Sequence, residues 1–213
     1  SEPLIGNGDF NSKEIKDLMK QSDVIVTNPP FSLFQKFFIL ITKLNKDFLI
    51  LGNQNAIGYK SVLPLIKVNK VFLGRSIHSG DREFIVPDDY IVRTGNSRID
   101  QNGEKYIRVS GIRWFTNIDY AENHVPFRLH TMEWNLKNSK HKFIKKYGYV
   151  KMENADIIEV PFRDAIPSDY KGVMAVPVTF IDKYNPEQFA IKGLLSTRSY
   201  YCIEKQKIYP YKR

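Results

Sequence analysis

Two different spacings of apolar residues alternate along the first third of the chain. Short β-branched or aromatic runs, typical of strands buried on both faces, lie at residues 23–27, 47–52 and 70–73. Helical spacing follows Asn11-Ser12, which would cap a helix carrying Ile15, Leu18 and Met19 on one face, and recurs at residues 31–44 and near residues 60–68. Strand, helix, strand, helix, strand predicts a parallel α/β sheet with right-handed crossovers.

The pattern changes near residue 75, where short strand-like runs and turn signals replace the alternation. The runs cover residues 82–86, 90–94, 105–109, 112–116, 155–160 and 173–180. Asn102-Gly103 is a strong hairpin signal, and residues 136–147 have a helical pattern. We therefore expect an α/β part over residues 1–75, followed by a mixed, β-rich part over residues 76–213.

Net charge adds a candidate partner. The formal charge of +9 and the pI near 9.4 favour a polyanion. Between residues 128 and 151, seven lysines and arginines are opposed by Glu133 alone, a local charge of +6. A solvated helix face explains such a run equally well, but aromatic residues among the cations favour nucleic acid: Trp134, Phe143, Tyr147 and Tyr149. The candidate DNA-binding residues are Lys137, Lys140, Lys142, Lys145 and Lys146.

Other classes of site have little support. Cys202 is the single cysteine, so no internal disulfide or thiolate metal cluster is expected, as in the reducing cytoplasm. Acidic residues and histidines lack the spacing of a metal site, and no apolar run reaches the length of a membrane span. We expect a cytoplasmic protein with neither metal nor membrane partner. The first residues carry no secretory pattern and no methionine, which indicates a processed or truncated start.

The most informative segment is Val24-Ile25-Val26-Thr27-Asn28-Pro29-Pro30-Phe31, an apolar strand that ends in a rigid loop. Open α/β sheets place ligand chemistry at the carboxyl ends of their strands. Two prolines remove two backbone donors, so the loop carbonyls and the Asn28 amide oxygen are available as acceptors. Acceptors that hold both N–H groups of an amine leave its lone pair free for an incoming methyl group. The plain alternative is a stiff turn between strand and helix.

Two further pairs of residues have both a functional and a structural interpretation. Asn53 and Asn55 follow a predicted strand and would face a substrate at the same sheet edge, yet we expect at least one of them to form a turn. Arg113 is of the type that reads guanine, whereas the adjacent Trp114 is expected to be buried in the core.

Five segments span nearly the whole chain: Gly8-Asp9-Phe10 and residues 26–34, 51–57, 112–117 and 172–180. Together and in this order, they resemble the EcoRI-type adenine-specific DNA methyltransferases, in which Asn-Pro-Pro-Phe is the catalytic motif. The resemblance implies a Rossmann-like fold, S-adenosylmethionine as methyl donor, and a flipped adenine in double-stranded DNA as acceptor. It also implies a site-specific enzyme that serves as the modification component of a restriction-modification system.

Carried over to this sequence, the resemblance assigns roles to five residues. Asn28 and the Pro29 carbonyl would accept hydrogen bonds from the adenine amine, Pro30 would complete the rigid loop, and Phe31 would stack on the base. Asp9 would contact the adenine ring of the donor, although an aspartate in this position equally suits a capping turn.

The chain departs from the family pattern at its start. The family places a glycine-containing donor-binding loop ahead of Gly8-Asp9-Phe10, and only seven residues precede Gly8 here. We therefore expect a C-terminal portion of a longer enzyme. Residues 1–75 would be the end of its catalytic α/β domain and residues 76–213 a region for DNA recognition, and this portion alone need not be active.

Two alternatives fit the same residues. One is a DNA-binding module or fragment with no activity of its own. The other is an amino-group methyltransferase that acts on RNA, cytosine or protein glutamine; Phe31 in place of a tyrosine, with the extended family segments, favours adenine in DNA. The recognised bases, the oligomeric state and the presence of a cognate endonuclease do not follow from the sequence.

Overall fold

The chain folds into two mixed α/β units. The computed structural model describes residues 4–74, 82–87, 89–91, 97–153, 155–195 and 200–205. The first unit comprises Ser1–Ile66 and Lys70–Ile118, and the second comprises Lys67–Asn69 and Asp119–Arg213. We expected residues 1–75 to serve catalysis and residues 76–213 to serve DNA recognition, and this division of roles stays a prediction.

The first unit begins with helices and strands in alternation. Its elements are α1 (Lys13–Gln21), β1 (Val24–Thr27), η1 (Phe31–Leu33), α2 (Phe34–Lys43), β2 (Asp47–Asn53), η2 (Gln54–Gly58), α3 (Leu63–Lys67), β3 (Phe72–Leu73), β4 (Arg82–Val86), β5 (Ser97–Ile99), β6 (Lys105–Val109) and β7 (Ile112–Thr116). The predicted elements up to residue 73 are confirmed, with α3 and β3 shorter than expected and the helix over residues 31–44 divided into η1 and α2. Ser12 caps α1 as predicted, because its hydroxyl accepts a hydrogen bond from Ile15 N at 3.2 Å.

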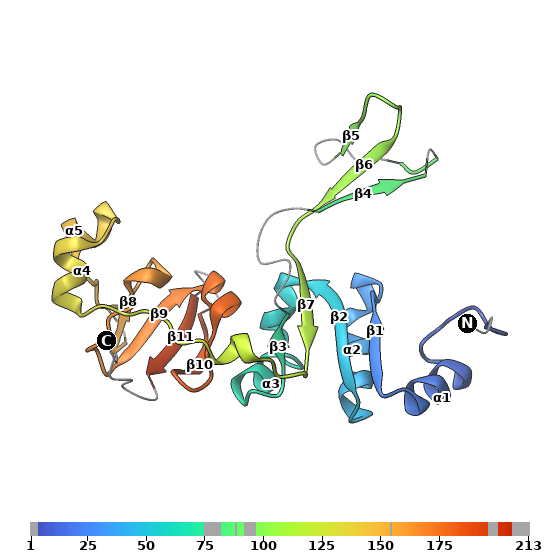
Figure 1. The fold of residues 1–213 in the computed structure, drawn as a ribbon, viewed down its shortest axis with the longest axis horizontal. Coiled ribbons are helices and arrows are strands. Elements are labelled where there is room, and N and C mark those ends of the chain that lie inside the picture. Colours follow the sequence, from blue (N-terminus) through green and yellow to red (C-terminus); the bar gives the residue numbers. More distant parts are fainter. Residues whose placement is uncertain are drawn as a thin grey trace. The chain divides into compact units, whose positions relative to one another are not determined.

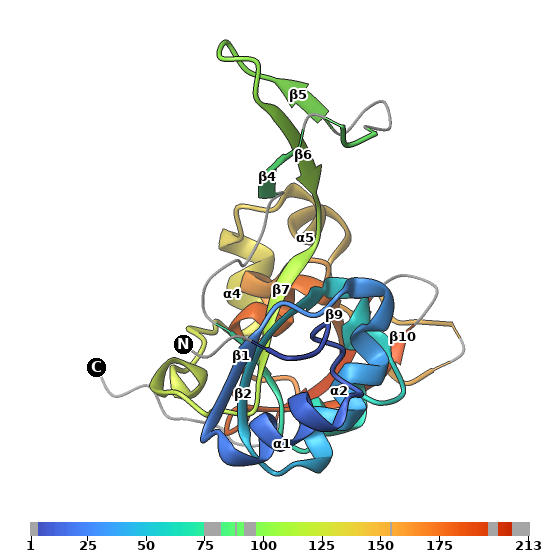
Figure 2. The ribbon, with the colours of Figure 1, turned by 90° about the vertical axis from the view of Figure 1, so that its right-hand side faces the viewer.

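The sheet that carries the candidate loop has the order β1-β2-β7-β3 (Figure 1). β1 and β2 are parallel as predicted, with Thr27 opposite Ile50, so β2 continues beyond the end of β1. α2 connects them and covers one face of the sheet (Figure 2). The ring centroids of Phe38 and Phe48 lie 6.0 Å apart across this contact.

β7 takes a place that the local pattern did not predict. Residues 112–116 form the expected strand, but β7 lies between β2 and β3 and runs antiparallel to both. Thr116 is opposite Leu49 on one side and Phe72 on the other. Local apolar spacing indicates a strand but not its partner. The first unit therefore holds a mixed sheet rather than a purely parallel one.

A separate three-stranded antiparallel sheet has the order β4-β6-β5. Its hairpin turns at Asn102-Gly103, as predicted, and Gly103 adopts a φ of 84°. The strand before this turn is β5 rather than the run predicted at residues 90–94; residues 90 and 91 are not in a strand, and residues 92–94 lie outside the described residues. Most side chains of this sheet are exposed.

The second unit contains the remaining elements. They are η3 (Ala121–His124), α4 (Met132–Asn138), α5 (Lys142–Tyr147), β8 (Ile157–Glu159), η4 (Arg163–Ala165), β9 (Val173–Pro177), η5 (Val178–Lys183), β10 (Phe189–Leu195) and β11 (Tyr200–Lys205). Its sheet has the order β10-β11-β9-β8, and β8 is parallel to β9. The strands predicted at residues 155–160 and 173–180 are confirmed as β8 and β9, both shorter. Phe180, Phe189 and Tyr201 are fully buried in its core.

The helix predicted at residues 136–147 is two helices, α4 and α5. Asn135 on α4 is 1% exposed, and its amide donates to Tyr149 Oη at 2.8 Å and to the Ala165 carbonyl at 3.2 Å. The Tyr149 hydroxyl also donates to the Ala165 carbonyl, at 2.6 Å. Burial raises the pKa of Tyr149 to about 12, so this hydroxyl keeps its proton and remains a donor. These bonds attach α4 to the segment that precedes β9.

Candidate active site and nucleic-acid surface

The Asn28-Pro29-Pro30-Phe31 loop leaves the sheet at the carboxyl end of β1. Pro29 is buried, whereas Asn28 is exposed and its side chain has no hydrogen-bond partner among the described residues. The Pro30 carbonyl accepts a hydrogen bond from Leu33 N at 2.9 Å and closes η1. No loop or turn hydrogen bond in the described part of the chain ends on the Pro29 carbonyl. The Asn28 amide oxygen and the Pro29 carbonyl are thus two uncommitted acceptors on adjacent residues.

The ring that follows the loop fixes it to the sheet. Phe34 is 1% exposed, and its ring centroid lies 5.1 Å from that of Phe115 on β7. A Cβ added to Gly52 on β2 would lie 2.3 Å from Phe34 Cε2, so only glycine leaves room for this ring. Phe31 is half-buried and packs against no other aromatic ring in the described part of the chain. Its ring is therefore not committed to an aromatic contact in these ranges.

Asp9 lies in a local turn. Its Oδ1 accepts hydrogen bonds from Asn11 N at 2.9 Å and from Asn11 Nδ2 at 3.2 Å, and its carbonyl accepts one from Ser12 N. Phe10 packs edge-on against Phe37 of α2 at 5.3 Å, which ties this turn to the helix that follows the loop. The capping turn is confirmed. A contact with the methyl donor would have to use Asp9 Oδ2, and this role stays a prediction.

The other candidates near the sheet edge have structural roles. Asn53 Oδ1 accepts a hydrogen bond from Asn55 N at 2.9 Å and caps η2, so the expected turn is confirmed. Arg113 is 4% exposed and donates from Nη1 to the Ile112 carbonyl at 3.0 Å. A guanidinium in this position is directed into the protein rather than toward a groove of DNA. Trp114, expected to be buried, is half-buried.

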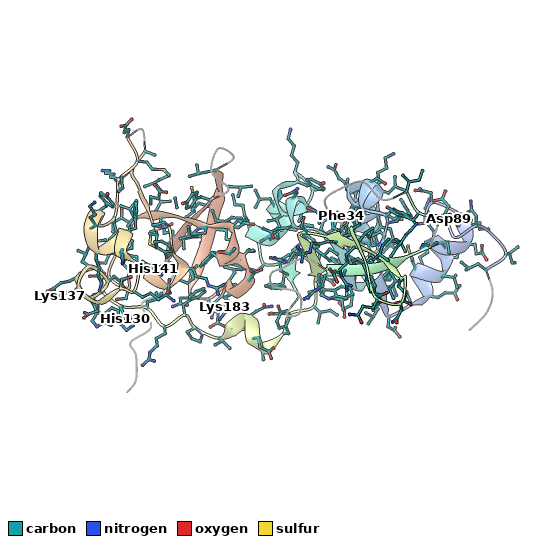
Figure 3. The ribbon with its side chains drawn as sticks, turned by 90° about the horizontal axis from the view of Figure 1, so that it is seen from above. Phe34, Asp89, His130, Lys137, His141 and Lys183 are labelled. Atoms are coloured by element: carbon teal, nitrogen blue, oxygen red, sulfur yellow. The ribbon has the colours of Figure 1, made fainter. Side chains whose placement is uncertain are left out.

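The candidate DNA-binding lysines lie on α4, on α5 and between them. Figure 3 labels Lys137 of α4, His141 directly before α5, and His130 ahead of α4. Lys137, Lys142 and Lys145 are exposed and form no ion pair with any described residue. Lys146 is also exposed, and its Nζ lies 4.9 Å from the centroid of the Tyr147 ring. Lys140 differs, because its Nζ lies 2.8 Å from Asp164 Oδ2.

The aromatic residues of this segment divide into two groups. Trp134, Phe143 and Tyr147 are exposed, whereas Tyr149 is committed to its bond with Ala165. The ring of Trp134 stacks on that of His130 with centroids 3.6 Å apart. An aromatic and cationic surface is therefore present, as the sequence pattern predicted, but without Tyr149.

Two histidine contacts gave no signal in the sequence, because each histidine has a partner far along the chain: Asp164 for His141 and Glu187 for His124. His141 stacks on Phe162, and its Nε2 lies 2.7 Å from Asp164 Oδ1. Burial alone would raise the pKa of Asp164, but hydrogen bonds from Lys140 and His141 outweigh it and lower the pKa. His124 bridges Asp119 at 2.9 Å and Glu187 at 3.1 Å.

Two classes of feature have no example in the part of the chain that the structure describes. No group of three or more histidine, cysteine, aspartate or glutamate side chains is arranged to hold a metal ion there. Within the same ranges, no helix combines the length and apolar character required to cross a membrane.

Comparison with known proteins identifies the family. Residues 1–212 match the family described as adenine-specific methyltransferase EcoRI. The chain belongs to this family. The resemblance inferred from the sequence motifs is confirmed, and the Asn28-Pro29-Pro30-Phe31 loop of this EcoRI-type methyltransferase family member lies at the carboxyl end of β1.

Three relatives of this EcoRI-type family member are similar over most of its chain. The type II methyltransferase M.EcoRI of Escherichia coli is 43% identical over 186 residues, 87% of this chain and 54% of the relative. The type II methyltransferases M.MgeORF184P of Mycoplasma genitalium and M.MpnI of Mycoplasma pneumoniae are 38% and 37% identical over 196 residues, 91% of this chain and 58% of each relative. The chain thus spans little more than half the length of these relatives. No solved structure matches it.

Proposed function

We propose that this chain carries the catalytic loop and a DNA-binding surface of an enzyme that transfers a methyl group from S-adenosylmethionine to the exocyclic amine of adenine at a specific DNA sequence. The relatives are named as type II methyltransferases, which supports a role as the modification component of a restriction-modification system. The parallel β1 and β2, connected by α2, support a Rossmann-like sheet in which β7 is an antiparallel addition.

The observation that carries the proposal is the pair of uncommitted acceptors on Asn28 and Pro29. An adenine amine has two N–H groups, and each needs an acceptor when the base leaves the duplex. The Asn28 side-chain oxygen and the Pro29 carbonyl are adjacent, and nothing in the described ranges hydrogen-bonds to either. Because both N–H groups would be held in these bonds, the lone pair of the amine nitrogen would lie free of them.

The remaining residues of the loop provide position rather than acid–base chemistry. Phe31 offers a ring face for the adenine, and the prolines limit backbone motion. Phe34, wedged between Gly52 and Phe115, holds the loop against the sheet. The reaction is a direct in-line displacement on the methyl carbon, for which positioning and electrostatics supply most of the acceleration.

When bound, S-adenosylmethionine supplies an electrophilic methyl group. In this chain Asp9 fits its adenine ring through one carboxylate oxygen only, since Oδ1 is used by Asn11. The Phe10 to Phe37 contact places the Asp9 turn beside α2, the helix that begins after the catalytic loop. This proximity supports a donor position next to Asn28, and Asp9→Asn would test it by weakening donor binding.

DNA binding by the second unit is the other half of the proposal. The exposed side chains of Lys137, Lys142, Lys145 and Lys146 suit phosphate contacts, because no described carboxylate neutralises them. Lys140 suits this role less, since Asp164 already pairs with it. The alternative of a DNA-binding module without activity retains this surface and predicts that the chain does not bind the methyl donor.

The test compares Asn28→Ala with Ser32→Ala, which changes an exposed side chain of η1 directly after the loop. Transfer of tritiated methyl groups to adenine in duplex DNA is measured in the protein as its gene encodes it. We expect Asn28→Ala to lower turnover about 100-fold or more while DNA affinity is unchanged, and Ser32→Ala to resemble the wild type.

Near-normal turnover in Asn28→Ala would remove the catalytic assignment. Calorimetric titration with S-adenosylmethionine separates the enzyme from the bare module, because a module without activity shows no heat of donor binding. Parallel transfer assays on RNA and on DNA lacking adenine test the alternative acceptors.

A further inference from the structure

α5 presents two aromatic rings to solvent. Phe143 and Tyr147 are 40% and 57% exposed, and their ring centroids lie 5.1 Å apart at an interplanar angle of 48°. Ile144, on the same helix, is fully buried and provides its attachment to the unit. Leu136 of α4 is also exposed and lies beside Gly148, the residue after Tyr147. A Cβ added to Gly148 would lie 3.5 Å from Leu136 Cδ2. The two rings are therefore not required for the core.

The surroundings of these rings are cationic. Lys142, Lys145 and Lys146 lie on the same six-residue helix, which contains no acidic residue. None of the three forms an ion pair within the described ranges, and the ammonium group of Lys146 lies against the Tyr147 ring. Nearby lysines are neutralised: Lys140 by Asp164 and Lys151 by Asp156. Positive charge thus remains where the rings are exposed.

We propose that Phe143 and Tyr147 form a stacking surface for an unstacked nucleobase, with Lys142, Lys145 and Lys146 holding the phosphates on either side of it. An intact duplex covers the faces of its bases, so the ligand is a base that has left the stack in a single-stranded or locally opened segment of DNA. This inference rests on the proposed function only in taking DNA as the partner. It adds a contact with the bases. If this surface contacted phosphates alone, its binding would not depend on whether the bases are stacked.

Charge and shape favour this ligand over a protein. A protein that covers an apolar patch needs acidic groups opposite three lysines, whereas a nucleic acid brings one phosphate for each base. Rings and cations interleaved on one short helix suit a strand in which bases and phosphates alternate. A contact between the α5 surfaces of two copies would place like charges opposite each other.

The test uses a variant that keeps apolar area but removes the ring faces, Phe143→Leu with Tyr147→Leu, and a control that keeps the ring, Tyr147→Phe. Binding of the full chain is titrated against a single-stranded oligonucleotide with one 2-aminopurine and against its duplex. We expect the double leucine variant to bind the single strand about tenfold more weakly with an unchanged salt slope. We also expect the wild type and Tyr147→Phe to alter 2-aminopurine fluorescence, and the leucine variant not to.

The outcomes separate the two proposals. If the leucine variant binds the single strand as the wild type does, the stacking surface is refuted and the proposed function is untouched. If the wild type binds neither oligonucleotide, the DNA-binding half of the proposed function fails together with this inference. If the leucine variant changes the sedimentation of the protein but not its DNA affinity, the pair belongs to a contact between copies, which also refutes the inference.

Discussion

Replacement of Gly52 by alanine should destabilise the first unit, although glycine to alanine in a strand is ordinarily stabilising. The added Cβ would lie 2.3 and 2.8 Å from Phe34 Cε2 and Cζ, and 2.9 Å from Phe115 Cε2. Phe34 and Phe115 are 1% and 0% exposed, so neither ring can move into solvent. The substitution therefore forces rings or backbone to shift at the point where the proposed catalytic loop is held.

The expected magnitude follows from two opposed effects. Overpacking of a core by one methyl group costs about 1–3 kcal/mol. Loss of glycine flexibility in the unfolded chain offsets about 0.4–1 kcal/mol of this. With central values of about 2 and about 0.7 kcal/mol, the free energy of unfolding should fall by about 1.3 kcal/mol. Gly193→Ala is the matched control, because Gly193 also lies in a strand and has no atom within 4 Å of its added Cβ. It should be neutral or slightly stabilising.

The two tryptophans make the assay specific, since Trp114 lies in the first unit and Trp134 in the second. In a Trp134→Phe background, urea unfolding followed by tryptophan fluorescence reports on the first unit alone. The Gly193→Ala control lies in the second unit, so its unfolding is followed through Trp134 in a Trp114→Phe background. We expect Gly52→Ala to lower the midpoint and Phe34→Leu, added to it, to restore part of the loss. A urea midpoint for Gly52→Ala at or above that of its parent would refute the close packing of Phe34 against Gly52. It would also refute the account of how the loop is positioned.

Three further outcomes are expected. Replacing Lys142, Lys145 and Lys146 by alanine should weaken binding to duplex DNA. The slope of log affinity against log salt should fall by up to about 2.7. An unchanged slope would mean that these lysines form a solvated helix face. Asn135→Ala should lower the stability of the second unit by about 1–3 kcal/mol, because it removes the buried amide that donates to Tyr149 and Ala165. Thermal unfolding of the exposed Asn138→Ala is the control, and equal effects of the two substitutions would contradict this prediction. Hydrogen bonding to Asp119, with a further contribution from Glu187, raises the pKa of His124 above 6.5. The stability that this contact provides is complete below pH 6.5 and is lost as the pH rises through the raised pKa. His124→Gln should therefore flatten the pH dependence of the free energy of unfolding from pH 6.5 upward. An NMR titration that places the imidazole pKa at or below 6.5 would contradict this prediction.

The sequence predicted what depends on neighbouring residues. Ser12 caps α1 and Asn53 caps η2 through bonds that span three and two residues, and Asn28 to Phe31 were found from the strand that precedes them. The pairing of β7 with β2 and β3 could not be predicted in this way, since Thr116 meets residues 67 and 44 positions earlier in the chain. Asn135 is a polar residue within a cationic segment, and its burial depends on Tyr149 and Ala165. For the candidate site, the motif predicted the acceptors, but only the structure shows that the Pro30 carbonyl accepts a hydrogen bond within η1.

The place of β7 also bears on how this protein could diversify. The chain leaves the four-stranded sheet at Gly74, whose amide donates to the Trp114 carbonyl at 3.0 Å, and it returns on the neighbouring strand, where Phe115 is opposite Leu73. Since exit and return are adjacent, lengthening the segment between them costs only about 0.6 kcal/mol for each doubling. Insertions, deletions or an exchanged module are therefore tolerated there while the loop at the end of β1 is left intact. Selection can rebuild the three-stranded sheet without touching Asn28 and Pro29, the residues proposed to hold the reacting base.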